Sequence, residues 1–410
     1  MIRSIIRYLK YIFYSIFFSE SRNIVLADLL RFNFGQKVIS NTTINPWTNK
    51  SYSEEERNAA LENAVQWLLH SQRSMIDDGF GSYHLINKWS GSYVETSGYI
   101  IPSLLEYGRW KNDNVITDKA ILSADWLMRV QKKNGAFQGG CIDENKPEVV
   151  FNTGQVIRGL QSAYKYTNDQ KYLNAAIKAC DWLCEIQEHD GYWKKNAFMS
   201  VPRVYDSYVD APLLMIHGIT GKEIYKEKAI KNLNWIVEKK QLINGWFEDC
   251  DNTVKRNERP ILHTIAYTID GLLECGIILN DKKFIDAAIK SADSLFEVFN
   301  KRKFLKGRYD SNWFGSENLI PTGCAQIAVV WMKLYKLTNN VQYLNAALKM
   351  NDILIFIQDR NIRDNSDTLG ALPGSYPIWG RYEPFCYPNW ATKFFVDSLL
   401  LENRCLEYAK

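Results

Sequence analysis

Acidic and aromatic side chains recur in this sequence at one kind of position, just before or at the start of a helix rich in small and apolar residues. Hydrolysis of a glycosidic bond needs two carboxyl groups flanking the bond, one acting as acid and the other as base or nucleophile. Glu95, paired with either Asp206 or Asp210, provides this combination. These three residues are therefore the first candidates for catalysis.

Removal of the C5 proton from a uronic acid is a second chemistry that the same region offers. The reaction leads to β-elimination or to epimerisation, and it needs a base, a proton donor and a cation that neutralises the carboxylate. His263 is a candidate base, and Arg203 and Arg381 carry the guanidinium fork that binds carboxylates. The remaining candidates would transfer a proton or hold a sugar: Tyr93, Asn152, Gln155, Tyr208, Tyr267, Glu383 and Trp390.

Binding of a glycan without chemistry is a third hypothesis, because aromatic rings stack on sugars and the chain holds 13 Trp, 23 Tyr and 19 Phe. Large helical interfaces explain the same enrichment. The single candidates have structural explanations too. Asp206 and Asp210 could cap a helix, Glu95 could favour a helix dipole, and Arg381 and Glu383 could pair with each other. The residue types alone leave both explanations open.

A repeat of roughly 57 residues gives these candidates a common position. Each unit begins with a helix that carries an anchor segment, continues through a turn containing Gly, and ends with a second helix. A unit of this length and composition is one helical hairpin. The anchors, spaced 53 to 59 residues apart, are Asn63–Trp67, Ala124–Trp126, Cys180–Trp182, Asn234–Trp235, Ala292–Ser294 and Asn351–Ile353.

The second helix of each unit is apolar on every side, as in Cys324–Trp331, and this marks it as the more buried of the pair. Six hairpins with alternating outer and inner helices predict an all-α fold, an (α/α)6 toroid. A linear helical solenoid is the competing arrangement, and the lack of polar capping repeats favours closure. In a closed toroid, the starts of the six inner helices face one funnel, where the candidate residues would meet.

Composition limits the classes of function. The net charge of +4 comes without a basic run, which argues against nucleic-acid binding. The eight cysteines are scattered without metal-ligand spacing, so we expect reduced thiols and a cytoplasmic protein. The sequence has no phosphate loop, dinucleotide fingerprint or run of metal ligands, and no cofactor is therefore expected.

The first 22 residues form a separate region in the sequence. Arg3, Arg7 and Lys10 precede an apolar stretch of about eight residues, which is too short to span a bilayer. We expect a basic amphipathic helix at the surface of the inner membrane; a helix packed on the domain and an export signal are the alternatives. Residues 23–54 are expected to be a connector, and 55–410 the toroid.

Two resemblances to known families follow from particular strings. The turns Gln131–Phe137 and Gln187–Trp193 resemble the Q-x3-G-x-W repeat of terpene cyclases, a mostly structural pattern found in α/α toroids. The acidic DxDD motif of squalene–hopene cyclases is missing, which weakens a cyclase hypothesis. Over nearly the whole chain the sequence instead resembles the six-hairpin glycosidase-like superfamily. Ser92–Tyr99 and Gly374–Phe395 are similar to bacterial polysaccharide biosynthesis proteins of the VpsJ type, which are encoded in capsule, O-antigen and exopolysaccharide clusters.

These resemblances imply a carbohydrate-active protein of bacterial surface-polysaccharide biosynthesis. The expected partner is an oligosaccharide or polysaccharide, either free or lipid-linked, and an acidic one is compatible with the arginines. Hydrolysis by paired carboxylates is the leading hypothesis, because the carboxyl groups are better placed than any single base. A uronate lyase or C5-epimerase, and a glycan-binding or assembly factor without catalysis, are the alternatives.

Overall fold

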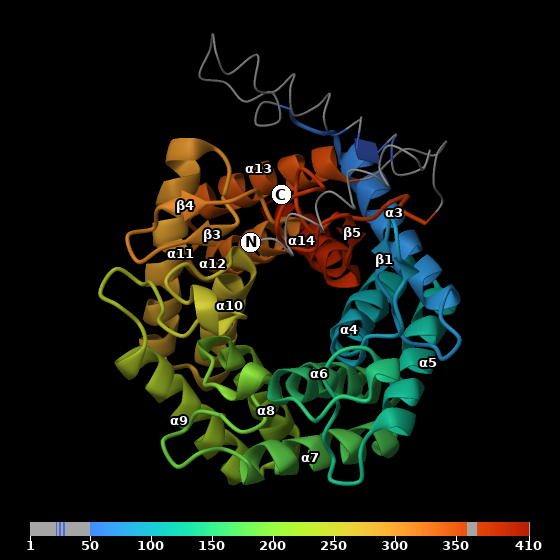
Figure 1. The fold of residues 1–410 in the computed structure, drawn as a ribbon, viewed down its shortest axis with the longest axis vertical. Coiled ribbons are helices and arrows are strands. Elements are labelled where there is room, and N and C mark those ends of the chain that lie inside the picture. The colour runs from blue at the N-terminus through green and yellow to red at the C-terminus, as the bar shows by residue number, and fades with distance from the viewer. Residues whose placement is uncertain (1–21, 23, 26–27, 29–49, 359–366, 410) are drawn as a thin grey trace.

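The computed structural model describes residues 22, 24, 25, 28, 50–358 and 367–409 of the chain. Within 50–409 it contains twelve α-helices that alternate between an outer and an inner ring (Figure 1). The outer helices are α3 (Glu54–Arg73), α5 (Asn114–Val130), α7 (Gln170–Glu185), α9 (Glu223–Lys239), α11 (Lys282–Arg302) and α13 (Val341–Ile357). The inner helices are α4 (Val94–Lys111), α6 (Val150–Thr167), α8 (Ser207–Thr220), α10 (Leu262–Leu279), α12 (Pro321–Thr338) and α14 (Asn389–Ala409).

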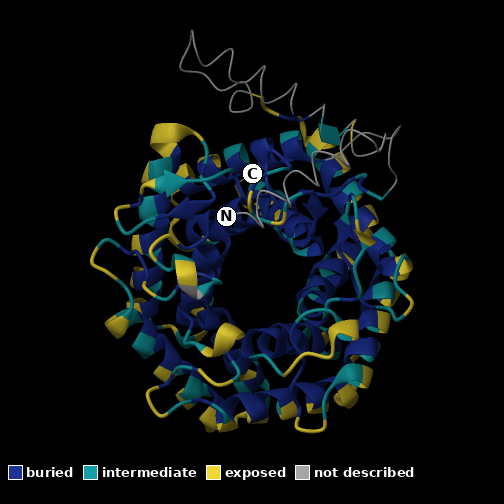
Figure 2. Cartoon of the chain, viewed as in Figure 1, coloured by how far each residue is buried: buried dark blue, intermediate teal, exposed yellow. Residues whose placement is uncertain are grey.

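The predicted (α/α)6 toroid is confirmed, because each outer helix packs mainly on the inner helix that precedes it around the ring and the inner helices pack side by side. The last inner helix, α14, packs against both α3 and α4, so the row of hairpins closes into a ring. Figure 2 shows the consequence for burial. The inner ring is mostly buried, with exposed residues mainly near the carboxyl-terminal ends of its helices, whereas the outer helices expose one face to solvent.

Helix ends repeat as regularly as the helices themselves. Four inner helices end at an Asn in the left-handed region, which Asn tolerates better than most residues. The next residue, an Asp or Asn, then caps the following outer helix through its side chain. These two-residue connections are Asn112-Asp113, Asn168-Asp169, Asn280-Asp281 and Asn339-Asn340. They join the carboxyl-terminal end of an inner helix directly to the next outer helix. The longer loops therefore lie at the amino-terminal ends of the inner helices.

The longer loops, at the amino-terminal ends of the inner helices, carry a repeated Gln-to-backbone contact. Gln131 donates to the carbonyl of Ala175 on the next outer helix at 2.8 Å, and Gln187 donates to Lys228 at 2.9 Å. This is the structural role of the Q-x3-G pattern, because each glutamine joins one unit to the next. Equivalent contacts are Gln72 to Lys119, Gln241 to Ala287 and, between the last and first units, Gln358 to Ala60.

Three further contacts fasten the last unit to the first. Arg57 on α3 forms ion pairs with Asp352 on α13 and with Glu402 on α14, where the two carboxylates are almost fully buried. Short antiparallel strands also cross the joint: β1 (Tyr83–His84) pairs with β2 (Lys88–Trp89) and with β5 (Cys386–Tyr387) from the last loop. A second short pair, β3 (Arg308–Tyr309) and β4 (Gly315–Ser316), lies in the fifth unit.

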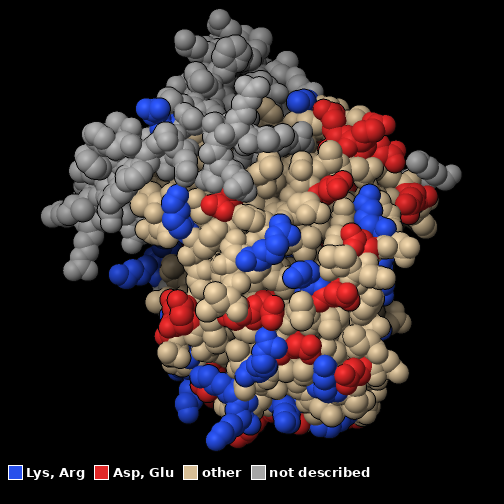
Figure 3. All heavy atoms as spheres, turned by 90° about the vertical axis from the view of Figure 1, so that its right-hand side faces the viewer, with Lys and Arg blue, Asp and Glu red and all other residues tan. Residues whose placement is uncertain are grey.

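The surface gives few functional clues. On the face seen in Figure 3, acidic and basic side chains are interspersed, in agreement with the small net charge. Among the described residues, one helix, α10, has the length and hydropathy of a membrane span, but 78% of that window is buried inside the ring. Except for residue 22, the expected amphipathic helix at residues 1–22 lies outside the described residues, and so does most of the connector.

Candidate functional site

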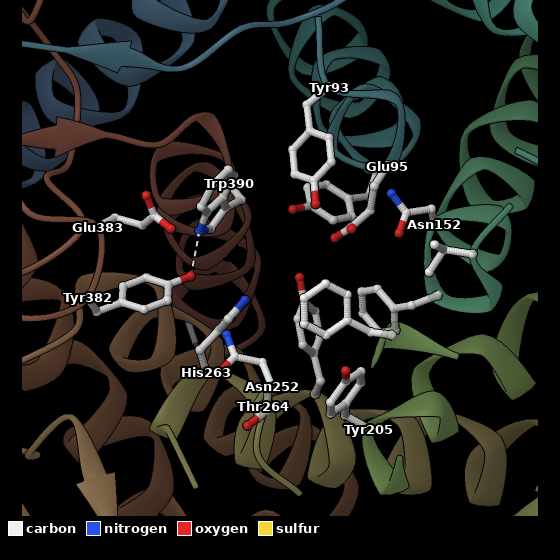
Figure 4. Close-up of a pocket in the computed structure, with 15 residues that line it drawn as sticks. Tyr93, Glu95, Asn152, Tyr205, Asn252, His263, Thr264, Tyr382, Glu383 and Trp390 are labelled. Carbon is white, nitrogen blue, oxygen red and sulfur yellow. Dashed lines mark hydrogen bonds between the residues drawn. The ribbon is translucent and has the colours of Figure 1, made fainter. Parts of the chain in front are cut away.

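A cavity of about 230 Å³ opens at the amino-terminal ends of the inner helices, where the sequence predicts the funnel (Figure 4). Side chains from the starts of four inner helices, α4, α6, α10 and α14, and from the segments before the inner helices surround it. The described lining residues are Tyr93, Glu95, Tyr99, Val149, Phe151, Asn152, Phe198, Tyr205, Asn252, His263, Thr264, Tyr267, Tyr382, Glu383 and Trp390. The wall is thus mostly aromatic, with two carboxyl groups.

Glu95 lies in the first turn of α4, where it faces the cavity. The dense packing around it removes water, and this desolvation raises the pKa of Glu95 to about 8. The Tyr93 hydroxyl, which points toward the carboxyl group in Figure 4, partly opposes the shift by stabilising the charged form. At neutral pH the Glu95 side chain therefore holds a proton that it can give to a bound molecule.

His263, near the start of α10, is held in one tautomer. Its Nδ1 lies 2.9 Å from Oε1 of Gln326 on α12, and an amide oxygen only accepts hydrogen bonds. The hydrogen is therefore on Nδ1, and Nε2 keeps its lone pair. Burial lowers the pKa of His263 to about 4, so the ring is neutral in the physiological range. It can accept a hydrogen bond from a sugar hydroxyl through Nε2.

The last unit supplies the opposite wall. The Trp390 indole donates to the Tyr382 hydroxyl at 2.9 Å, which fixes both rings (Figure 4). Glu383 follows Tyr382 directly and also lines the cavity; in the same view it lies on the side opposite Glu95, beyond the Trp390–Tyr382 pair. Glu383 has a φ of 43°, a left-handed conformation that is uncommon for this residue type and that turns the loop sharply at this point. Two carboxyl groups therefore approach one space from opposite sides.

Aromatic rings also close the bottom of the cavity. Tyr99, Phe151, Tyr267 and Phe394 form this aromatic floor, with ring centroids 4.9 to 5.6 Å apart between neighbours. A second cavity of about 270 Å³ lies beyond the floor, and Tyr99 lines both. Charged side chains dominate the second cavity through four ion pairs: Arg158–Glu274, Lys333–Asp270, Lys393–Asp397 and Arg404–Glu106.

More than half of the site residues predicted from the sequence line the first cavity. They come from the starts of four inner helices and the loop before α14. They are Tyr93, Glu95, Asn152, His263, Tyr267, Glu383 and Trp390. Four of the seven, Tyr93, Glu95, Glu383 and Trp390, belong to the two strings that resemble the polysaccharide proteins, so those strings supply much of the wall.

The two aspartates predicted as partners of Glu95 lie outside this cavity. Asp210 on α8 points to the outer ring, where Asn232 of α9 donates to its Oδ2 at 2.7 Å. Asp206 is buried in the turn before α8, and one of its oxygens has no hydrogen-bond partner. Burial raises the pKa of Asp206 to about 8, against the opposing charge of Arg203. The carboxyl group that shares the cavity with Glu95 is instead Glu383.

Four further predicted residues take other positions. Arg203 is buried and donates to the backbone carbonyls of Asp251 and Phe198, so its guanidinium joins two rim loops. Arg381 is exposed and pairs with Glu317, not with Glu383. The other two are Tyr208, which lines the second cavity under Arg158, and Gln155, which is fully buried in α6.

Several lining residues were not assigned a role from the sequence. Tyr99 lies four residues after Glu95, so helical periodicity places both on one face, and this signal could have found it. Tyr382 stands in the expected last-unit segment without an assigned role. Phe198 and Tyr205 come from single-turn 3-10 helices and Asn252 from a loop, and such short segments show no periodicity in the sequence. Within the described residues, no three His, Cys, Asp or Glu side chains are grouped to hold a metal ion.

The fold relates this chain to carbohydrate-active hydrolases of known structure. A heparin-specific unsaturated glucuronyl hydrolase matches with a TM-score of 0.69 at 13% identity, over 87% of this chain and 99% of that chain. The unsaturated glucuronyl hydrolase of Bacillus sp. GL1 matches with a TM-score of 0.67 at 13% identity, over 84% and 96% of the two chains. An α-amylase from Clostridium perfringens matches with a TM-score of 0.61 at 12% identity, over 84% and 97%.

At 12–13% sequence identity, these structural matches establish a shared architecture, the six-hairpin toroid. They do not establish a shared reaction or substrate. No protein-family model matches the sequence, and no curated protein matches it either. The resemblance to polysaccharide biosynthesis proteins of the VpsJ type therefore stays a prediction.

Proposed function

We propose that the protein is a glycoside hydrolase that uses Glu95 as general acid and Glu383 as general base. The observation that carries the proposal is a carboxyl group that keeps its proton at neutral pH inside an aromatic-lined cavity of sugar-ring dimensions. A raised pKa in such surroundings suits the acid of a glycosidase. The shared fold with carbohydrate-active hydrolases supports the reaction class.

The proposed step is a single displacement. Glu95 gives its proton to the glycosidic oxygen, the bond from that oxygen to the anomeric carbon breaks, and the leaving sugar departs as an alcohol. Glu383, on the opposite side, takes a proton from a water molecule whose oxygen bonds to the anomeric carbon. Trp390 and Tyr382 provide stacking surfaces, and Asn152 and His263 provide hydrogen bonds to hydroxyl groups. One water is consumed and both carboxyl groups exchange their protonation states.

The lyase and epimerase hypotheses find less support in the cavity. Both need a cation beside the substrate carboxylate, and the described lining residues include no Lys or Arg. The low pKa of His263 also makes its neutral ring a weak base. We therefore place hydrolysis first and keep binding without turnover as the alternative.

The biological setting that we propose is the assembly or trimming of a bacterial surface polysaccharide in the cytoplasm. It rests on the resemblance of Ser92–Tyr99 and Gly374–Phe395 to the VpsJ-type proteins. The eight cysteines, all free and seven of them buried, agree with a reducing compartment.

An NMR time course in D2O tests the reaction. The purified protein is mixed with the host's own surface polysaccharide and with the oligosaccharides released from its lipid carrier. New reducing-end anomeric signals are expected. A 4,5-unsaturated uronate signal would establish elimination instead, and deuterium at C5 without cleavage would establish epimerisation. Broadened sugar signals without any new resonance would leave binding as the function.

A pair of amide substitutions tests the residue assignment. Glu95→Gln removes the transferable proton and is expected to lower turnover by at least 100-fold while sugar binding persists. Asp210→Asn is the matched control, because Asp210 is also buried with a raised pKa but faces α9. It is expected to keep turnover within about threefold of wild type. Loss of activity in Asp210→Asn with a folded protein would return the catalytic role to the sequence-predicted aspartate.

A further inference from the structure

We propose that three arginines beside the cavity mouth form a subsite for an anionic group of the glycan, on the sugar next to the one in the cavity. Arg256, Arg308 and Arg381 converge on the carboxylate of Glu317, and we name these three the arginine cluster. The inference depends on the proposed function only in taking the ligand to be a glycan.

The three guanidinium groups reach Glu317 from different loops. Arg256, in the turn before α10, lies 2.6 Å from Oε1, and Arg381, in the loop before β5, lies 3.3 Å from the same oxygen. Arg308 on β3 approaches Oε2 through Nε at 3.4 Å. Glu317 itself has a φ of 66°, so the backbone is held in an uncommon conformation to present this side chain.

The cluster holds more positive charge than its carboxylates neutralise. Arg308 has a second partner, Asp251, at 2.8 Å, so three arginines share two acidic groups. Arginine does not lose its proton in proteins. Arg203, on the other side of Asp251, adds a further positive charge, because its guanidinium donates to backbone carbonyls. Even when the neighbouring carboxylate of Glu383 is counted with Glu317 and Asp251, these four arginines leave a net charge of +1.

Exposure shows which members a ligand can reach. The Arg308 side chain is 8% exposed and is fixed, whereas Arg381 is 69% exposed and Arg256 33%. The single contact of Arg381 leaves most of its five N–H donors for another acceptor. Carboxylate, sulfate and phosphate groups all match the guanidinium fork. The outer part of the cluster is thus available to an anion, and the inner part supplies charge.

The position of the cluster fixes where the anion would lie on the glycan. Tyr382 and Asn252 line the cavity on one side (Figure 4). Each directly follows a residue of the charged network, because Arg381 precedes Tyr382 and Asp251 precedes Asn252. The cavity wall in the described part of the chain carries no lysine or arginine. A glycan with one sugar in the cavity would therefore place that sugar among aromatic and amide groups and the next sugar beside Arg381. This predicts an uncharged sugar inside and an acidic group outside.

Binding is measured with the Glu95→Gln variant, which does not consume its ligand under the proposed mechanism. A glycan array supplies neutral structures and their carboxylated, sulfated and phosphorylated counterparts, and calorimetry quantifies the best matched pair. We expect the acidic member to bind at least 10-fold more tightly at low salt, with a preference that weakens as salt rises. The three acidic forms show which anion is preferred. Equal affinity for acidic and neutral members would overturn the proposal.

Arginine substitutions separate a subsite from a purely structural network. Arg381→Gln is expected to weaken binding of the acidic glycan about 10-fold, as for one charged hydrogen bond, and to leave its neutral counterpart within about twofold. Arg404→Gln is the matched control, because Arg404 is an exposed arginine with one carboxylate partner at the other end of the ring. If Arg381→Gln weakens both glycans equally, the cluster only holds the rim loops in place and the subsite is excluded.

The two proposals fail in different experiments. Preferential binding of acidic glycans without any cleavage by the wild-type protein would remove the hydrolase assignment and keep the subsite. Cleavage of a glycan with no preference for acidic forms would keep the hydrolase and remove the subsite.

Discussion

Glu95 acquires its chemistry from its position in a helix and not from a charged neighbour. The start of α4 directs the carboxyl group into the ring, where burial is the largest influence on its pKa. Asp206 and Asp210 are also buried with raised pKa values, yet neither lines the cavity. A perturbed pKa is therefore insufficient to identify a catalytic group, and access to the cavity decides between the three.

The pH dependence of turnover is expected to follow the proton on Glu95. Because the pKa is raised to about 8, the acid is protonated below that pH, and turnover should fall about tenfold per pH unit above it. Tyr93→Phe removes the hydroxyl that stabilises the carboxylate, so the alkaline limb should move to higher pH. The measurement is kcat against pH for both proteins. A limb that stays in place or moves to lower pH contradicts this account of Glu95.

The same residues show what sequence can and cannot predict about the site. Glu95 and His263 line the cavity as expected, because the repeat predicts where their helices begin. Asp210 lies outside the cavity because a helix start has several faces, and the sequence does not show that Asp210 is on the face that contacts Asn232 of α9. Asn252 and Phe198 lie in loops without periodicity, so their positions emerge only once the chain is folded.

At the scale of the helical hairpin, the repeated turn is a packing device. Gly135, Gly191, Gly245 and Gly370 all have positive φ, and a Cβ atom at any of them would meet the backbone of the next outer helix. The glutamine that usually stands four residues earlier donates to that same helix. The sequence therefore predicted the units correctly from this turn, because close packing between neighbours restricts the residue types that fit it.

A comparison of two glycines separates close packing from backbone strain. Gly135 has a φ of 92°, and an added Cβ would lie 2.3 Å from the carbonyl oxygen of Lys178. Gly221 also has a positive φ, of 68°, but nothing lies within 4 Å of its added Cβ. We expect Gly221→Ala to cost about 1 kcal/mol of unfolding free energy, and Gly135→Ala at least about 2 kcal/mol more, because the helices must separate. Urea unfolding of both variants measures this, and equal losses would contradict a packing role for the turn.

At the scale of the whole molecule, closure of the ring depends on the joint between its first and last units. The count of six hairpins predicted closure, but not the groups that achieve it, since Arg57 and its two partners are about 295 and 345 residues apart. Contacts over such distances leave no local pattern in a sequence. The residues before the ring are a further part of the predicted organisation that the described structure does not include.

Replacing Arg57 by Met is expected to weaken this joint strongly. It leaves the buried carboxylate of Glu402 without its cation and leaves Asp352 with Lys349 alone, at 3.6 Å, at a cost of about 3–5 kcal/mol. Burial raises the pKa of both groups and Arg57 opposes that rise, so the variant's carboxyl groups should take up protons more readily. Its stability should then fall as pH rises from 5 to 7.5, since the folded state binds protons that the unfolded state has lost.

Urea unfolding at pH 5 and pH 7.5 measures both the loss and its pH dependence. Arg129→Met is the control, because Arg129 and Asp78 form an exposed pair worth less than about 1 kcal/mol. A loss in Arg57→Met no larger than in the control would show that other contacts hold the ring closed.

Because of the aromatic floor, the toroid has a cavity that is closed at one end and not a continuous channel. Tyr99, Tyr267 and their neighbours block passage between the two cavities, so a polymer cannot be threaded through the ring and must leave by the mouth it entered. If the protein is the proposed hydrolase, this shape restricts it to chain ends and requires the polymer to dissociate after each cleavage. Early digests of an end-labelled oligosaccharide should then contain one short product of uniform size, and the polymer should shorten step by step.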